Sequence, residues 1–307
     1  MSSKIRRAAA LVAAGLALPA VPAQAADESG RLAPSSEWSV SSDGESCLIV
    51  RRFGGEGGVS FGLQAFSPNA SLYNTIVRGD PLPHRDAGAL DIEYRYGRDA
   101  QAVAATGLLG GGRNPRVTFF APLEPASVLE ARRNGEPPSA ADAAREAAID
   151  EFAIAFSRGR PLVLQLGSMA APLRQLRECA ATLPEKWGMD PAVQRSLSRP
   201  AVPLDMGSWL GPGNYPWEYL RNGLSVRVHL RLMTDERGAV SRCVVQAPRG
   251  DNIAGTVACR EIAKTARFEP ALDAEGRPVA SYFTTSIFFN TPRSNGPLRG
   301  ESRTQGL

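Results

Sequence analysis

From about residue 38 to residue 120, hydrophobic and polar positions mostly alternate, as they do in β-strands with one buried face. Val59, Phe61 and Leu63 show this spacing clearly, because each is followed by a small or polar residue. Turns rich in glycine or proline separate such runs. The expected strands are 47–53, 59–63, 72–77, 89–96 and 116–120.

The pattern becomes mixed in the next stretch of the chain. Residues 136–150 are rich in Ala and in paired charges, which favours a short helix. Alternation returns at 152–156 and 162–166 and predicts a hairpin, although one long helix would also fit.

A helix is expected directly after this hairpin. Ser168 is a predicted N-cap, and apolar residues then recur at helical spacing from Met169 to about Leu183. Cys179 lies on the apolar face of this helix. Residues 26–188 are therefore expected to form a mostly β N-terminal domain with a flanking helix.

The last third of the chain predicts a second, smaller domain of sheet and helix. Residues 189–215 contain many prolines and little periodicity, which is typical of a linker or a surface strap. Residues 216–290 then follow the order strand, strand, helix, strand. The expected elements are a strand at 225–233, a turn at 234–238, a strand at 239–246, a helix at 252–266 and a strand at 279–290.

The whole chain is therefore predicted to be α+β, with a mostly β domain followed by a ββαβ domain. Along 225–233, Arg227, His229 and Arg231 alternate with apolar residues, and this polar face is expected to point away from the core. The tail, 291–307, is polar and without periodicity, and it is expected to be disordered.

The first 25 residues have the features of a secretory leader. Three basic residues precede an uncharged apolar stretch from Ala8 to Pro22, and Ala23-Gln24-Ala25 is a small-x-small cleavage site. The apolar stretch of about 15 residues is shorter than the roughly 20 residues that a spanning helix needs. We therefore expect cleavage after about Ala25 and export to the periplasm, with a retained leader as the alternative.

Loss of this leader changes the charge balance. The full chain carries 35 basic and 31 acidic residues, and removal of the three basic residues of the leader leaves 32 against 31, a net charge of +1. A nearly neutral chain offers no electrostatic case for nucleic acid as a partner.

The four cysteines are expected to form two disulfides, because an even number in an exported chain favours bridges. Cys243 and Cys259 fall on a strand and a helix of one predicted domain, and we pair them. Cys47 on an early strand and Cys179 on the flanking helix form the second predicted pair. A metal site is not expected, since the chain has no Cys-x-x-Cys and only two histidines.

Motifs that suggest catalysis are weak. Residues 58–62 match G-x-S-x-G around Ser60, but a hydrolase elbow needs a strand before the serine and a helix after it, and neither is predicted here. Asp91 and Glu93 share one strand face, where acidic residues are usually solvated. His84 is expected to be exposed in a loop, and no cofactor is predicted. An enzyme in the N-terminal domain remains an alternative.

Residues 216–290 resemble the C-terminal domain of the TonB family of energy transducers. The resemblance rests on the ββαβ order, the Gly238 turn, the Arg267-Phe268-x-Pro270-Ala271 motif, the Gly276-x-Pro278 loop and the Phe288-Phe289 finish. It implies a periplasmic domain of a Gram-negative envelope that binds segments of outer-membrane transporters by adding a strand to its sheet. Such domains can exchange strands, so a homodimer also fits.

The resemblance places the partner-binding edge on the last strand. The candidate residues are Val279, Ser281, Tyr282, Phe283, Thr285, Ile287, Phe288 and Phe289. The chain departs from a transducer in its cleavable leader, its cysteines and the β-rich domain in place of a Pro-rich spacer. We therefore expect a non-enzymatic, soluble partner-binding relative. The alternative is a membrane-anchored transducer that keeps its leader.

Overall fold

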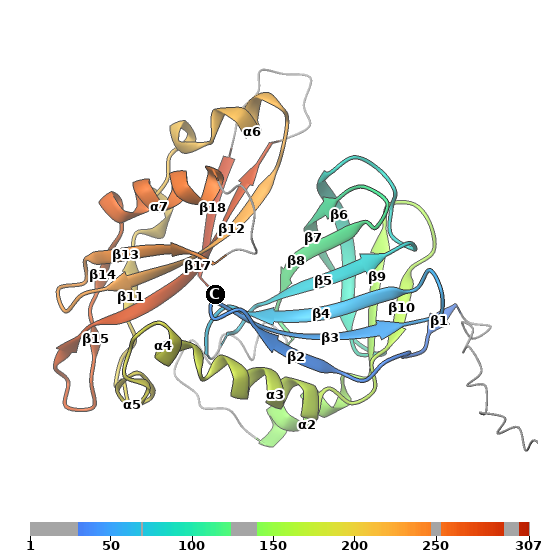
Figure 1. Ribbon diagram of the computed structural model, residues 1–307, viewed down its shortest axis with the longest axis horizontal. Coiled ribbons are helices and arrows are strands. Elements are labelled where there is room, and N and C mark those ends of the chain that lie inside the picture. Colours follow the sequence, from blue (N-terminus) through green and yellow to red (C-terminus); the bar gives the residue numbers. More distant parts are fainter. Residues whose placement is uncertain (1–29, 69, 124–139, 247–252, 292–300, 307) are drawn as a thin grey trace, which may run out of the picture.

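The computed structural model describes residues 30–68, 70–123, 140–246, 253–291 and 301–306, and it is an α+β protein dominated by strands (Figure 1). The N-terminal half is built on one ten-stranded sheet in the order β1-β10-β9-β6-β7-β8-β5-β4-β3-β2. Its strands are β1 Arg31–Leu32, β2 Ser39–Ser42, β3 Cys47–Phe53, β4 Val59–Ala65, β5 Tyr73–Gly79, β6 Gly88–Tyr96, β7 Val103–Gly110, β8 Arg116–Ala121, β9 Glu151–Phe156 and β10 Leu162–Gln165.

This sheet curls so that its two ends approach each other. β1 pairs in parallel with β10 at one end. The residues that follow β1 bond to β3 near the other end, where Ser35 N–H donates to the Arg52 carbonyl at 2.8 Å and Gly54 N–H donates to the Ala33 carbonyl at 2.8 Å. The N-terminal segment therefore connects both ends, which leaves little open sheet edge.

The alternation seen in the sequence corresponds to the inward and outward faces of this curled sheet. Phe61, Phe119 and Phe152 are fully buried, and the rings of Phe61 and Phe152 lie 4.8 Å apart. The predicted strands and the predicted hairpin at β9 and β10 are confirmed. β2 and β7 were not predicted, because a run of exposed serines and a run of small residues carry no strong apolar alternation.

In the chain, α2 (Ala140–Ala148) lies between β8 and β9, and α3 (Ala170–Ala180) and α4 (Leu183–Lys186) follow β10. α3 packs on β2, β3 and β4 with Leu173 and Leu176 fully buried. The N-cap of α3 is Met169 rather than Ser168, and it makes no side-chain cap bond. The single helix predicted from Met169 to about Leu183 is divided into α3 and α4.

Residues 189–215 pack against the C-terminal half, which agrees with the predicted surface strap rather than with a free linker. They form α5 (Pro191–Arg195), β11 (Val202–Leu204) and two short 3-10 turns, η1 (Met206–Ser208) and η2 (Pro212–Asn214). Trp209 is 1 % exposed, and its ring lies 5.4 Å from that of Phe268. The buried indole attaches the segment to the core, while the many prolines only prevent long regular elements.

The C-terminal half is a four-stranded antiparallel sheet in the order β13-β12-β17-β18, with α7 on one face (Figure 1). The predicted ββαβ order is confirmed by β12, β13, α7 and β17. The elements are α6 Trp217–Arg221, β12 Val226–Thr234, β13 Val240–Val245, α7 Ile253–Thr265, β14 Arg267–Glu269, β15 Ala271–Leu272, β16 Pro278–Val279, β17 Ser281–Asn290 and β18 Glu301–Gly306. β14 pairs with β11, and β15 pairs with β16.

The prediction of a disordered tail is wrong for Glu301–Gly306. These residues form β18, which lies antiparallel to β17 from Thr285 to Asn290. A polar sequence can form a strand here because the backbone groups of β17 supply the hydrogen bonds, so little apolar surface is required.

Both predicted disulfides are present, Cys47–Cys179 between β3 and α3 and Cys243–Cys259 between β13 and α7. Two bridges fit a protein of an oxidising, extracytoplasmic compartment. None of the helices in the described part of the chain combines the length and the apolar character needed to cross a membrane. The predicted leader lies outside the described residues.

Candidate functional site

The predicted partner-binding edge, β17, is an inner strand over most of its length. β12 pairs with it from Ser281 to Phe289, and β18 pairs with its other side from Thr285 to Asn290. The edge was predicted on the assumption that the third strand ended the sheet. The C-terminal strand, which has no hydrophobic signal in the sequence, takes that place instead.

The side chains of β17 alternate between two packed faces. Thr285, Ile287 and Phe289 are fully buried, and Ile287 and Phe289 belong to the core that α7 covers. Phe283 is half-buried on the same side, 5.3 Å from the ring of Phe268. Ser281 is buried and donates to Gln194 Oε1 at 2.8 Å.

The alternate residues of β17 face the N-terminal half. The Tyr282 ring packs edge-on against Trp187 at 5.0 Å, and the Phe288 ring lies under Arg227. Val279 belongs to β16 and pairs with Ala271. The predicted aromatic anchors are therefore packing residues in this arrangement, and β17 contributes backbone rather than exposed side chains.

The polar face of β12 is not solvated as the alternation predicted, because it docks on the N-terminal half. His229 is 8 % exposed, and its ring stacks on Phe66 with centroids 4.2 Å apart. The Phe120 ring lies 4.8 Å away on the same imidazole. Burial, with a smaller contribution from the nearby Arg227 charge, lowers the pKa of His229 to about 3, so the ring is neutral at ordinary pH.

Arg231 makes the main ion pair across this junction. It is 4 % exposed, its Nη1 lies 3.0 Å from Glu45 Oε2, and its guanidinium lies 4.3 Å from the Trp187 ring centre. Gln246 adds two hydrogen bonds from its amide nitrogen, to the Glu45 carbonyl at 2.8 Å and the Phe66 carbonyl at 3.1 Å. The two halves are therefore joined by specific polar contacts around the 43–46 turn.

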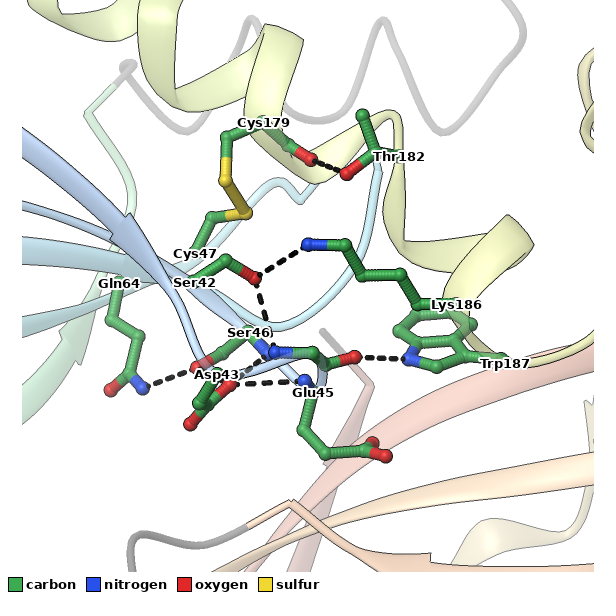
Figure 2. The surroundings of a disulfide bond; sticks show 11 residues. Ser42, Asp43, Glu45, Ser46, Cys47, Gln64, Cys179, Thr182, Lys186 and Trp187 are labelled. Atoms are coloured by element: carbon green, nitrogen blue, oxygen red, sulfur yellow. Dashed lines mark hydrogen bonds between the residues drawn. A yellow bond between two sulfur atoms is a disulfide. The ribbon is translucent and has the colours of Figure 1, made fainter.

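Figure 2 shows why this turn is well placed to receive the C-terminal half. Asp43 Oδ1 accepts hydrogen bonds from the backbone N–H groups of Glu45 at 3.0 Å and Ser46 at 2.7 Å. The Trp187 indole donates to the Gly44 carbonyl at 2.9 Å, and the Cys47–Cys179 disulfide follows the turn directly. The turn is fixed at both of its ends, which presents the Glu45 carboxylate to Arg231.

The residues with possible catalytic chemistry are not brought together. Ser60 lies within strand β4 rather than at a strand–turn–helix elbow. His84 is exposed, and its Nε2 lies 2.9 Å from the Asp80 carbonyl oxygen. Asp91 and Glu93 are exposed on β6. Within the described ranges, no three His, Cys, Asp or Glu side chains gather closely enough to hold a metal ion.

In comparisons with known proteins, no protein-family model, curated protein or solved structure matches the chain. The functional assignment therefore depends on the geometry of the sheet and of the junction. Sequence reasoning missed the junction residues His229, Arg231 and Gln246. The only signal for His229 and Arg231 was a strand whose polar face carries two arginines and a histidine, which is also the pattern of a solvated face, and Gln246 directly after β13 gave none.

Proposed function

We propose that this protein is a non-enzymatic, extracytoplasmic binding module that takes up an extended partner segment beside β17. The C-terminal half would act as a TonB-like domain, and periplasmic or outer-membrane proteins would supply the segment. The ββαβ order, the two disulfides and the leader-like N-terminus support this assignment. The partner strand would occupy the position of β18, so binding would involve exchange of the chain's own C-terminal strand.

The observation that carries the proposal is the pairing of β18 with β17. Five polar residues and a glycine are held there in antiparallel register, from Thr285 opposite Gly306 to Asn290 opposite Glu301. A strand edge that holds a segment with so little apolar content does so through backbone hydrogen bonds, which most sequences can supply. A partner segment of β character would use the same backbone groups and add side-chain contacts.

A truncated chain that lacks residues 301–307 tests this proposal. A fluorescent peptide with the sequence of residues 300–307 is titrated into the truncated and the full-length chain. We expect binding to the truncated chain and at least about tenfold weaker binding to the full-length chain, because the tethered strand competes at an effective concentration in the millimolar range. Hydrogen exchange of the 285–290 amides should slow when the peptide binds.

The matched control is the same peptide with proline at the positions of Arg303 and Thr304. Successive N–H groups of a strand point to opposite sides, so one of the two prolines must remove a donor that faces β17. This peptide should not bind. Equal binding of both peptides, or no peptide binding and unchanged exchange in the truncated chain, would contradict strand addition at β17.

A further inference from the structure

A cleft runs between the two halves of the molecule beside β17. Its inner part has a volume of about 330 Å³ and is lined by Thr106 and Phe120 on one wall and by Arg227, Ser286 and Asn290 on the other. The middle part, about 300 Å³, shares Thr106 and Asn290 with the inner part. The outer part adjoins the middle part at Asp91, Thr106 and Ser157, and it is lined by residues of the N-terminal half alone.

Charge is distributed unevenly along this cleft. Arg227 borders the inner part, Arg85 and Asp91 both border the middle part, and Asp91 and Glu93 border the outer part. A ligand that reaches from the inner to the outer part would therefore meet a positive end and a negative end.

The Arg227 guanidinium is held in position without an anionic partner. It lies 4.7 Å from the Phe288 ring centre and 5.5 Å from that of Phe120. Its Nη1 is buried and has no hydrogen-bond partner, and no carboxylate of the described residues offsets its charge. Burial lowers the pKa of Arg227 to about 10, so the side chain remains charged at neutral pH.

Arg227 as a whole is half-buried, but a guanidinium nitrogen that is buried without a partner is costly, and proteins usually pair such groups. Arg231, four residues further along the same strand and on the same face, shows the paired alternative with Glu45. Arg227 differs because it faces a cavity instead of a carboxylate.

Polar groups that could complete an anion site surround Arg227. The Thr106 and Ser286 hydroxyls line the same inner part. Asn290 Oδ1 already accepts a hydrogen bond from the Ser225 hydroxyl at 3.2 Å, which leaves the amide nitrogen as its donor. The inner part therefore presents several donors and two aromatic rings.

We propose that this cleft binds a ligand with a single carboxylate, which pairs with Arg227 and takes further hydrogen bonds from Ser286, Thr106 or Asn290. The Phe120 and Phe288 rings would contact the apolar part of the ligand next to the carboxylate. One unpaired cation balances one negative charge, and the acidic residues of the outer part disfavour a second. A carboxylate therefore fits better than a phosphate, and its source would be a small organic acid or the C-terminus of a peptide.

Two matched pairs of probes test this proposal on the full-length chain by calorimetric titration. The first pair is acetyl-Ala-Ala-Ala with a free or an amidated C-terminus, and the second is benzoate and benzamide. We expect each carboxylate to bind with a dissociation constant of about 1 mM or below and each amide at least about tenfold more weakly. Tighter binding of the peptide would identify a peptide C-terminus as the source, and tighter binding of benzoate a small acid.

Two substitutions localise the binding. Arg227→Gln removes the cation, and Asn290→Asp places a carboxylate on the same sheet face, diagonally across from Arg227, because Phe288 is the direct partner of Arg227. Asn290→Asp keeps the acceptor for Ser225, so it tests the site even if Arg227→Gln loosens the fold. Both should weaken carboxylate binding at least about tenfold, whereas Arg52→Gln, at an exposed position on β3 away from the strands that line the cleft, should not change it.

Three results would overturn the proposal. The first is the absence of binding of both carboxylates at about ten times the expected dissociation constant. The second is equal binding of the carboxylates and the amides. The third is unchanged carboxylate binding in the Asn290→Asp variant with its fold intact by circular dichroism.

Discussion

The His229 ring on β12 stacks on the Phe66 ring of the N-terminal half, with centroids 4.2 Å apart and planes inclined by 25°. This contact makes the polar face of β12 an internal junction between the two halves. A neutral imidazole fits between Phe66 and Phe120, whereas a charged one would have to be desolvated beside Arg227.

Acid should weaken the fold through His229. The pKa of the imidazole is about 3 in the folded chain and about 6.5 in the unfolded chain, so between these values the unfolded chain binds a proton that the folded chain does not. The stabilisation is therefore complete above about pH 6.5 and is lost as the pH falls, by at most about 1.4 kcal/mol per pH unit. Urea unfolding from pH 7 to pH 4.5 measures this slope.

His229→Phe provides the control for this slope, because the variant keeps an aromatic ring and cannot titrate. Its free energy of unfolding should fall less steeply with acid than that of the native chain. Parallel curves for the two proteins would show that another group causes the acid sensitivity.

Removal of Glu45 should lower the free energy of unfolding more than removal of Arg231. Glu45→Gln leaves a guanidinium that is 4 % exposed without a counterion, and we expect a loss of about 2 kcal/mol. Arg231→Met keeps the side-chain volume and leaves a carboxylate that is 33 % exposed and can be hydrated, so we expect about 1 kcal/mol.

Urea unfolding of the two single variants and the double variant checks this order. The double variant should be no less stable than Glu45→Gln alone, because it no longer contains the unpaired buried charge. A larger loss from Arg231→Met than from Glu45→Gln would contradict the argument.

Gly238 and Gly276 form a matched pair for backbone effects. Both have positive φ, +75° and +78°, which costs a residue with a Cβ about 1 kcal/mol. A Cβ on Gly238 would also lie 1.9 Å from the Phe268 carbonyl oxygen, whereas one on Gly276 would have nothing within 4 Å. Gly238→Ala should therefore lower the thermal midpoint by at least twice as much as Gly276→Ala, and equal shifts would be inconsistent with the close approach.

The two disulfides should differ in their contribution to stability. Cys243–Cys259 joins residues 16 positions apart, and Cys47–Cys179 joins residues 132 positions apart. In the chain-entropy model these loops contribute about 3 and about 5 kcal/mol. Unfolding of the Cys243→Ala/Cys259→Ala and Cys47→Ala/Cys179→Ala variants measures both values. The reverse order would mean that loop length does not govern their effect.

Much of the local structure could be predicted from residue patterns. The strand containing Val59, Phe61 and Leu63, the ββαβ order and both disulfide pairs are present as expected, since each follows from spacing that places apolar groups or thiols on one face. For segment 189–215 the sequence left a linker and a surface strap open, because its attachment depends on a few buried residues, such as Trp209, among many prolines.

The sequence by itself determined the elements with clear apolar periodicity and the faces of those elements, because side-chain periodicity is a local property of the chain. Only the tertiary structure decided what covers each face and each edge. Arg227, His229 and Arg231 have the spacing of a solvated face, yet they meet Phe120, Phe66 and Glu45 from residues more than 100 positions away. The pairing of Glu301–Gly306 with the edge of β17 also could not be predicted from the sequence, since backbone hydrogen bonds leave no pattern in the side chains.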